Sequence, residues 1–259
     1  MNGSLMPIFL QSMAAWSALT FFSYLIIAGG GYYFIWMRGK ERWQHKRILP
    51  ERRRPPQPWN EFKLSTVLCL MFGAMLGGIT VLTALGWTRM YANIGDFGWT
   101  YFLGSIVLMA VLHDSYYYWA HRLMHSKLVF RHIHLVHHRF TNPTPFACYA
   151  FHPFEGVVEI AIIGLLLLLM PIHSLALAIY IVIQTVLNVI SHLGYEFYPA
   201  WISRWFITST HHSLHHAHFH GHYMLYFNAW DRLMGTNQAD YHDICESLAA
   251  AKPPEYRAS

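Results

Sequence analysis

The stretch WSALTFFSYLIIAGGGYYFIWM, residues 16–37, carries no charged side chain over 22 residues. A helix needs roughly 20 predominantly apolar residues to cross the hydrocarbon core of a bilayer. The 259-residue chain as a whole is also apolar, with 54% hydrophobic and only 12% charged residues, whereas charged residues make up about 25% of an ordinary soluble domain. The sequence therefore predicts an integral membrane protein.

Further apolar runs extend this prediction along the chain. Residues 64–87 form a second uncharged run of spanning length, and residues 97–112 form a third that leads directly into His113. A fourth block, residues 157–190, is too long for one helix and contains Pro171, so it predicts a helical hairpin whose short first arm is tilted or re-entrant. We expect an all-α membrane protein with about three transmembrane helices, this hairpin and a helical cap.

The distribution of basic residues predicts the orientation. Residues 38–63 hold nine of the 18 lysines and arginines, and residues 1–37 hold none. Such an excess marks a cytoplasmic loop, so the segment from His113 onward is expected on the cytoplasmic side, in a bacterial inner membrane or the endoplasmic reticulum. The net charge of +5 comes mostly from this loop, which indicates membrane topology and contact with anionic lipids rather than nucleic-acid binding.

The remaining composition excludes some classes of protein. The three cysteines are far apart and form no CxxC pair, so neither a disulfide framework nor a cysteine metal site is indicated. The first 15 residues lack a basic n-region, and the first apolar run therefore predicts an uncleaved anchor.

The histidines are concentrated in one part of the chain. Seventeen of the 19 lie between His113 and His222, and eight of these fall in the clusters HRLMH (121–125), HLVHH (134–138) and HSLHH (212–216). Residues three or four apart project from the same helical face. Imidazoles so close together would repel one another if protonated and would leave unpaired nitrogens if buried and neutral. A divalent metal ion removes both problems, and we expect one here.

The clusters hold more histidines than the four ligands of one tetrahedral ion, which predicts a two-metal site. Imidazole suits iron, zinc and copper alike, so ligand type leaves the metal open. Carboxylates are scarce in this region, which excludes the glutamate-rich pattern of ferritin-like di-iron bundles. Between His113 and His222 they are Asp114, Glu155, Glu159 and Glu196.

These clusters resemble the three histidine boxes HxxxH, HxxHH and HxxHH of the membrane fatty acid hydroxylase and sterol desaturase superfamily. The sequence around the boxes is similar as well. It contains, in this order, the segments YYYWAHRLMH, HLVHHRFTNPTPFACYAFHPFEG, SHLGYE and HHSLHHAHFHGHYMLYFNAWDRLMGT. Within the superfamily, PTPFA, AFHP and WDRLMGT are most similar to the C-5 sterol desaturase branch. The resemblance divides the chain into N-terminal transmembrane helices with a basic loop (1–96), a histidine-box catalytic domain (97–236) and a C-terminal tail (237–259).

The resemblance implies a non-haem di-iron centre that uses O2 to oxidise an unactivated C–H bond of a sterol or fatty-acyl lipid. Removal of one hydrogen and transfer of a hydroxyl group gives hydroxylation, and removal of a second hydrogen gives desaturation. Carried over residue by residue, the resemblance assigns nine catalytic metal ligands: His121, His125, His134, His137, His138, His192, His212, His215 and His216. Whether Glu196, His152 or His211 also ligates metal is left open.

The same interpretation predicts the partners. The boxes lie just beyond the ends of the spans, so a lipid substrate can enter laterally from the bilayer. The chain has no cysteine quartet and no flavin or nicotinamide fingerprint, so an external donor, cytochrome b5-like or a ferredoxin with its reductase, must supply electrons. Two other classes compete with the oxygenase. A divalent-metal transporter needs polar residues along its spans, and a zinc-dependent membrane hydrolase needs a carboxylate base beside its metal.

Overall fold

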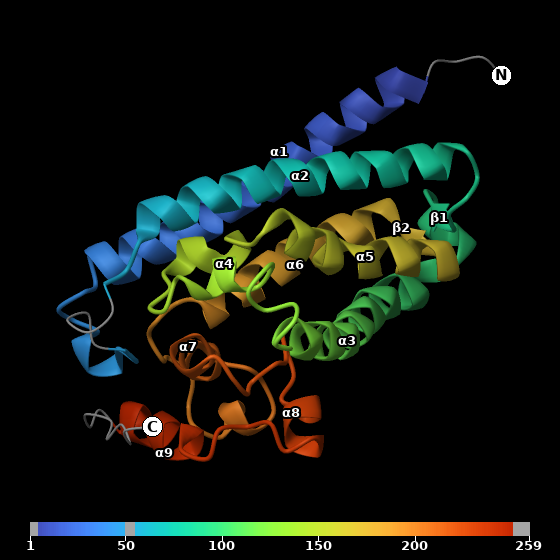
Figure 1. Ribbon diagram of the computed structural model, residues 1–259. Coiled ribbons are helices and arrows are strands. Elements are labelled where there is room, and N and C mark those ends of the chain that lie inside the picture. The colour runs from blue at the N-terminus through green and yellow to red at the C-terminus, as the bar shows by residue number, and fades with distance from the viewer. Residues whose placement is uncertain (1–4, 50–54, 251–259) are drawn as a thin grey trace.

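Long helices form the framework of the computed structural model, which describes residues 5–49 and 55–250 (Figure 1). They are α1 (Leu5–Gly31), α2 (Pro58–Ala84), α3 (Gly98–Met124), α5 (Pro153–Leu169) and α6 (Ser174–Ser191). The shorter helices are α4 (Leu135–His138), α7 (Ser209–His218), α8 (Ala229–Leu233) and α9 (Tyr241–Ala249). α1 continues as a π-helix, Tyr32–Met37, and single 3-10 turns cover Gln44–Lys46, Ile94–Asp96, Pro145–Tyr149 and Ile202–Arg204.

The helices pack in layers. α1 and α2 lie side by side in opposite directions and cover α5 and α6, while α3 packs against α5 and α6 (Figure 1). Small residues allow the close approach of α1 and α2, since a side chain at Gly73 would collide with Ser17 and one at Gly77 would meet the backbone of Met13. The GAMLGG stretch of α2 therefore serves helix packing.

Three described helices are long and apolar enough to cross a membrane: Leu5–Met37, Pro58–Ala84 and Ser174–Ser191. The first contains the predicted span at 16–37, and the second covers the predicted span at 64–87 up to its own end at Ala84; both begin earlier than predicted. In α2 this is because Pro58 occupies the first turn, where proline is tolerated. The third is α6 rather than the run at 97–112. That run lies in α3, where His113 and Asp114 interrupt the apolar sequence.

The break expected near Pro171 separates α5 from α6. α5 has 17 residues and is about 26 Å long, shorter than the roughly 30 Å hydrocarbon core. How its two arms sit in the bilayer stays a prediction. The connection carries β2 (Ile172–His173), which pairs in parallel with β1 (Met90–Tyr91). The all-α expectation misses these two strands, whose two-residue length leaves no periodic signal to detect.

The basic loop contacts the region of the histidine boxes at the end of the long helices opposite β1 and β2 (Figure 1). The backbone N–H of Ile48 donates to the Gly194 carbonyl, and the backbone N–H of Glu196 donates to the Lys46 carbonyl. Ile48 also packs in a buried cluster with Leu214 of α7. The shared end agrees with the charge pattern, whereas the side of the membrane stays a prediction. Residues 50–54 of the loop and 251–259 of the tail lie outside the described residues.

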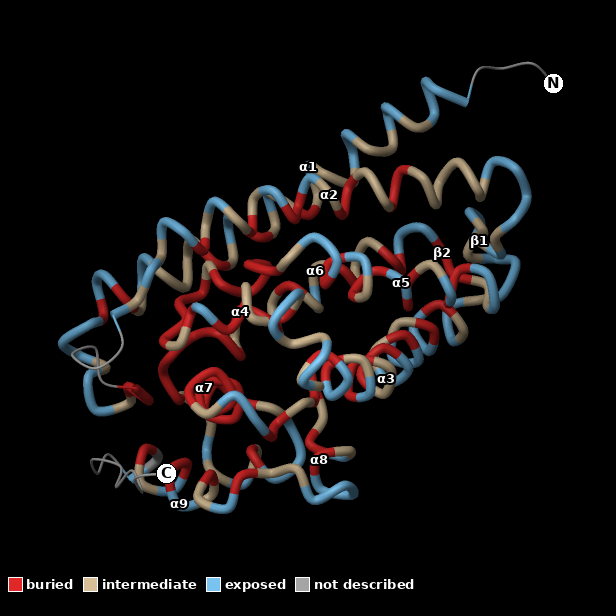
Figure 2. Tube along the Cα trace, in the orientation of Figure 1, coloured by how far each residue is buried: buried red, intermediate tan, exposed pale blue. Residues whose placement is uncertain are grey.

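α7 is the most deeply enclosed of the short helices although its sequence, STHHSLHHAH, is polar. Nearly all of its residues are buried (Figure 2). Burying several imidazoles is costly unless each nitrogen finds a partner. The contacts of these rings therefore decide what the cap does.

Candidate metal centre

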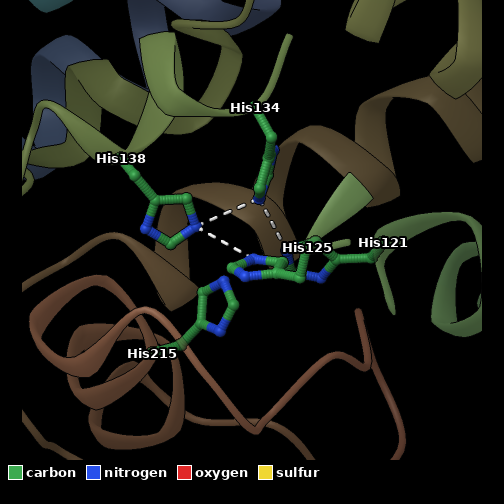
Figure 3. A group of neighbouring side chains, drawn as sticks. All are labelled: His121, His125, His134, His138 and His215. Carbon is green, nitrogen blue, oxygen red and sulfur yellow. Dashed lines mark hydrogen bonds between the residues drawn. The ribbon is translucent and has the colours of Figure 1, made fainter. Parts of the chain in front are cut away.

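The nine predicted histidines converge into two groups, and within each group the ligand atoms lie within 4.8 Å of one another. The first group is His121, His125, His134, His138 and His215, and the second is His137, His192, His212 and His216. In Figure 3 the rings of the first group point toward a common centre from three different parts of the chain.

Local structure explains the convergence. α3 ends at Met124, so His121 lies in its last turn and His125 follows as its C-terminal cap. The short helix α4 carries the second box, and α7 carries the third. His192 caps the C-terminus of α6 and completes the second group. Two pairs of adjacent residues divide between the groups: His138 and His215 point to the first, and His137 and His216 point to the second. This is because side chains of successive helical residues point in directions about 100° apart around the axis.

One segment directly after α7 orients three imidazoles of the first group through its backbone carbonyls. The Nδ1–H groups donate to the carbonyl oxygens of residues 219, 221 and 223: His125 to Phe219 at 3.0 Å, His215 to Gly221 at 2.6 Å and His121 to Tyr223 at 3.0 Å. These acceptors are backbone groups, which carry no side-chain signature and therefore could not be predicted from the sequence.

The conformation of this segment is unusual. Phe219 adopts the left-handed region at φ 63° as the C-cap of α7, and Gly221 adopts φ 70°. A Cβ at Gly221 would lie 2.6 Å from the Thr236 carbonyl oxygen, so no larger residue fits without a backbone shift. Strained backbone of this kind persists where the surrounding structure holds it in place, often at functional sites.

Other acceptors orient further histidines in the same way. His134 donates from Nδ1 to Glu155 Oε1 at 2.8 Å, and both side chains are fully buried. In the second group, His137 donates to the Ala150 carbonyl at 3.3 Å, and His192 donates to the Asn188 carbonyl at 2.8 Å. Glu155 is a second contributor that the sequence analysis did not assign. Its position two residues after the AFHP segment, in the first turn of α5, was the available signal.

The backbone carbonyls fix the tautomer of the five rings that contact them. A carbonyl oxygen only accepts, so the proton stays on Nδ1 and Nε2 presents a lone pair. The facing Nε2 atoms are 3.0 Å apart for His121 and His134 and 3.4 Å apart for His137 and His192. Two lone pairs at this distance repel, and Nε2 of His215 is buried without any partner. A cation bound between the nitrogens satisfies them, so the residues fit a metal ion in each group.

Burial also keeps the rings neutral. It lowers the pKa of His125 and of His192 to about 4 each. For the other seven histidines, burial and then the neighbouring imidazoles lower the pKa well below the usual value. Neutral imidazole is the form that binds metal, so the groups are ready to ligate at neutral pH.

The three residues left open as ligands have other partners in this structure. Glu196 accepts from the backbone N–H and hydroxyl of Thr210 and so holds the start of α7. His211 belongs to the capping box of the same helix. His152 caps α5 by accepting from the Phe154 N–H at 3.2 Å. None of these three side chains joins either histidine group.

The sequence is similar to one known protein family. The model of the fatty acid hydroxylase family matches residues 106–236, half of the chain. The chain belongs to the fatty acid hydroxylase family. Its members include oxidoreductases that act on lipids, so the resemblance noted in the sequence is confirmed. With its three apolar helices of spanning length, this chain is a multi-pass membrane member of the family.

Several similar proteins are named as sterol enzymes. A Delta(7)-sterol 5(6)-desaturase of Gibberella zeae is 30% identical over 86% of this chain and 67% of its own length. A lathosterol oxidase of Rattus norvegicus is 36% identical over 60% of this chain and 53% of its own length. A C-4 methylsterol oxidase of Schizosaccharomyces pombe is 31% identical over 59% of this chain, which spans about half of that relative (53%). No solved structure matches the chain.

Proposed function

We propose that this protein is a membrane-bound non-haem di-iron oxygenase that hydroxylates or desaturates an unactivated C–H position of a lipid, with O2 and external electrons as co-reactants. The single observation that carries the proposal is the convergence of nine imidazoles, eight of them buried, into two groups whose Nε2 atoms face each other. The names of the relatives support a sterol, and a fatty-acyl lipid is the other candidate substrate.

The histidines have a defined role in this proposal. Each group would hold one iron ion through its Nε2 atoms, while the Nδ1 contacts keep the rings in place. Two iron ions together with O2 supply the oxidant that an unactivated C–H bond requires. The cap would face the cytoplasm, where a cytochrome b5-like protein or a ferredoxin with its reductase delivers electrons.

An apolar pocket of about 400 Å³ supports access from the bilayer. It lies between α3, α6 and the segment that follows α6, and its lining includes Ala110, Leu187, Tyr198, Phe206 and Tyr226. This volume falls within the usual range of small-molecule sites. Aromatic side chains such as Tyr198 and Phe206 thus border the pocket, and a lipid tail can occupy it without crossing water.

Two contacts argue against the competing classes. His173 lies at the break in the 157–190 block, and its ring accepts from the Leu175 N–H and donates to the Ala92 carbonyl. These contacts stabilise the start of α6, so the ring is not available to line a transport path. Glu155 contacts the outer nitrogen of His134, so the imidazole ring separates its carboxylate from the metal-facing side. It is badly placed to act as the base of a hydrolase.

Replacing Glu155 with leucine is expected to weaken metal binding by about 10- to 100-fold, because an outer hydrogen-bond partner orients its histidine ligand and raises its basicity. Competition with a coloured chelator measures the affinity of the purified protein. Glu246→Leu, which changes an exposed carboxylate on α9, is the matched control. Equal metal affinity for Glu155→Leu and the wild type would show that this carboxylate does not support a ligand.

Comparative lipid mass spectrometry tests the proposed function. Cells expressing the wild type are compared with cells expressing the double variant His121→Ala, His212→Ala, which removes one histidine from each group. We expect a lipid that gains one oxygen or loses two hydrogens in the wild type only. Identical lipid profiles, with O2, iron and an electron donor present, would refute the oxygenase.

A further inference from the structure

A second polar cluster lies away from the metal centre, in a pocket enclosed by the long helices. Its wall is mostly apolar, with Phe72 and Ile163 among its residues, but His113, Glu159, Tyr180 and Gln184 also line it. His113 and Glu159 are buried, with 3% and 8% of their surface exposed. A histidine and a carboxyl group in such surroundings carry a large desolvation cost, which needs a compensating contact.

The contacts within the chain leave this cluster incomplete. His113 Nδ1 lies 2.6 Å from the Tyr180 hydroxyl, which in turn lies 3.3 Å from the Tyr226 hydroxyl. His113 Nε2 is buried and has no hydrogen-bond partner. The nearest carboxylate oxygen, Glu159 Oε2, is 4.0 Å away, beyond hydrogen-bond distance. One face of the imidazole and one carboxylate thus point into the pocket without a mutual bond.

We propose that His113 and Glu159 form a subsite for a hydroxyl group of the lipid substrate. When the Tyr180 hydroxyl donates to Nδ1, the proton of the neutral ring is on Nε2. Nε2–H then offers a donor beside the Glu159 acceptor. A hydroxyl group has one donor and two acceptor lone pairs, so it can bond to both at once. The inference rests on the proposed function and narrows its substrate class.

The chemistry of the pocket excludes other lipid groups. No lysine or arginine lines it, so its wall offers no fixed cation to compensate the charge of a carboxylate or a phosphate. Its open volume is about 50 Å³, about a third of a cavity that admits benzene, so it accepts a hydroxyl group with a few carbons rather than a charged headgroup. An unmodified acyl chain has no group to match the cluster. The subsite therefore selects a neutral lipid alcohol such as a sterol.

The subsite also has a fixed relation to the metal centre. His113 and His121 lie on the same helix eight residues apart, about 12 Å along its axis. Glu159 lies one turn after Glu155, the partner of His134. Anchoring the hydroxyl group at this distance would determine which carbon of a rigid ring system reaches the histidine groups.

Equilibrium binding without turnover tests the subsite. The iron-loaded full chain is placed in nanodiscs under nitrogen, without reductant, and its affinity is measured for cholest-7-en-3β-ol and for the 3-O-methyl ether of the same sterol. The ether can accept a hydrogen bond but cannot donate one to Glu159. We expect the wild type to bind the alcohol about tenfold more tightly, the effect of one additional hydrogen bond. Equal affinities would overturn the proposal.

Two variants assign the preference to these side chains. Glu159→Met and His113→Phe are each expected to reduce the ratio of the two affinities to within about twofold, while His173→Phe, a buried histidine remote from the pocket, keeps the wild-type ratio. Size-exclusion profiles and melting temperatures verify folding. Glu159→Met should melt no lower than the wild type, because it removes a buried carboxyl group. A tenfold ratio retained in a folded variant would overturn the assignment.

The binding ratio and the lipid profile fail independently. If no oxidised lipid is found but the ratio behaves as expected, the subsite stands and the proposed oxygenase is wrong. If oxidised lipids appear and the wild type does not distinguish the alcohol from its ether, the oxygenase stands and the subsite is wrong.

Discussion

His138→Ala is expected to reduce lipid oxidation to background while the protein remains in the membrane. The His138 ring is fully buried, and its Nε2 lies 3.0 Å from that of His134 and 3.2 Å from that of His125. Loss of this nitrogen opens the first histidine group at its centre. Membrane insertion depends on α1, α2 and α6, the apolar helices of spanning length, which the substitution does not touch.

Metal analysis and product formation together measure this effect. The purified wild type should contain two metal ions per chain, and His138→Ala should contain about one or none. His132→Ala is the matched control, because His132 lies in the same stretch of sequence but is exposed and belongs to neither group. The ligand assignment would be refuted by a His138→Ala protein that forms product at the wild-type rate.

Asp114→Ala is expected to destabilise the protein by at least about 3 kcal/mol. The Asp114 carboxylate accepts from the backbone N–H groups of Leu225, Tyr226 and Phe227 at 2.7–3.3 Å. Removing it leaves three donors without a partner, and each buried unpaired donor costs about 1–3 kcal/mol. The sum is a large part of the roughly 5–15 kcal/mol by which a folded protein is stable.

Thermal unfolding of the detergent-solubilised protein measures this loss. Asp243→Ala, which alters an exposed aspartate on α9, should melt with the wild type. The expected loss concerns the strand-like segment that leads from the carbonyls at 219–223 to α8, so metal content should fall together with melting temperature. An Asp114→Ala protein that melts with the control would mean that water replaces the carboxylate at these donors.

Much of the site was predictable because its ligands are side chains with a helical spacing. Pairs such as His121 and His125 project from one helix face in any helix, so their convergence follows from local geometry. The division into two groups did not follow. It depends on where α4 and α7 lie against α3, and it assigns the neighbours His137 and His138 to different groups. Such tertiary placement leaves no mark on a single sequence.

Other features were harder to predict for physical reasons. The carbonyls that orient His121, His125 and His215 belong to the backbone, and only the left-handed Gly221 hints at their arrangement. The expected third span at 97–112 was inferred from its apolar residues alone, whereas α3 also positions His113 and Asp114. Polar functional side chains lower the mean hydropathy of the helix that carries them.

The division of neighbouring histidines between the groups has a consequence for metal loading. His137 and His138 are joined by one peptide bond, as are His215 and His216, and each pair contributes one ring to each group. A metal ion bound in one group orders the backbone shared with the other group. The second ion then binds ligands that are already ordered, so less conformational entropy is lost. Loading should then be cooperative. A population of these molecules at limiting metal would divide into empty and full ones, with few in between.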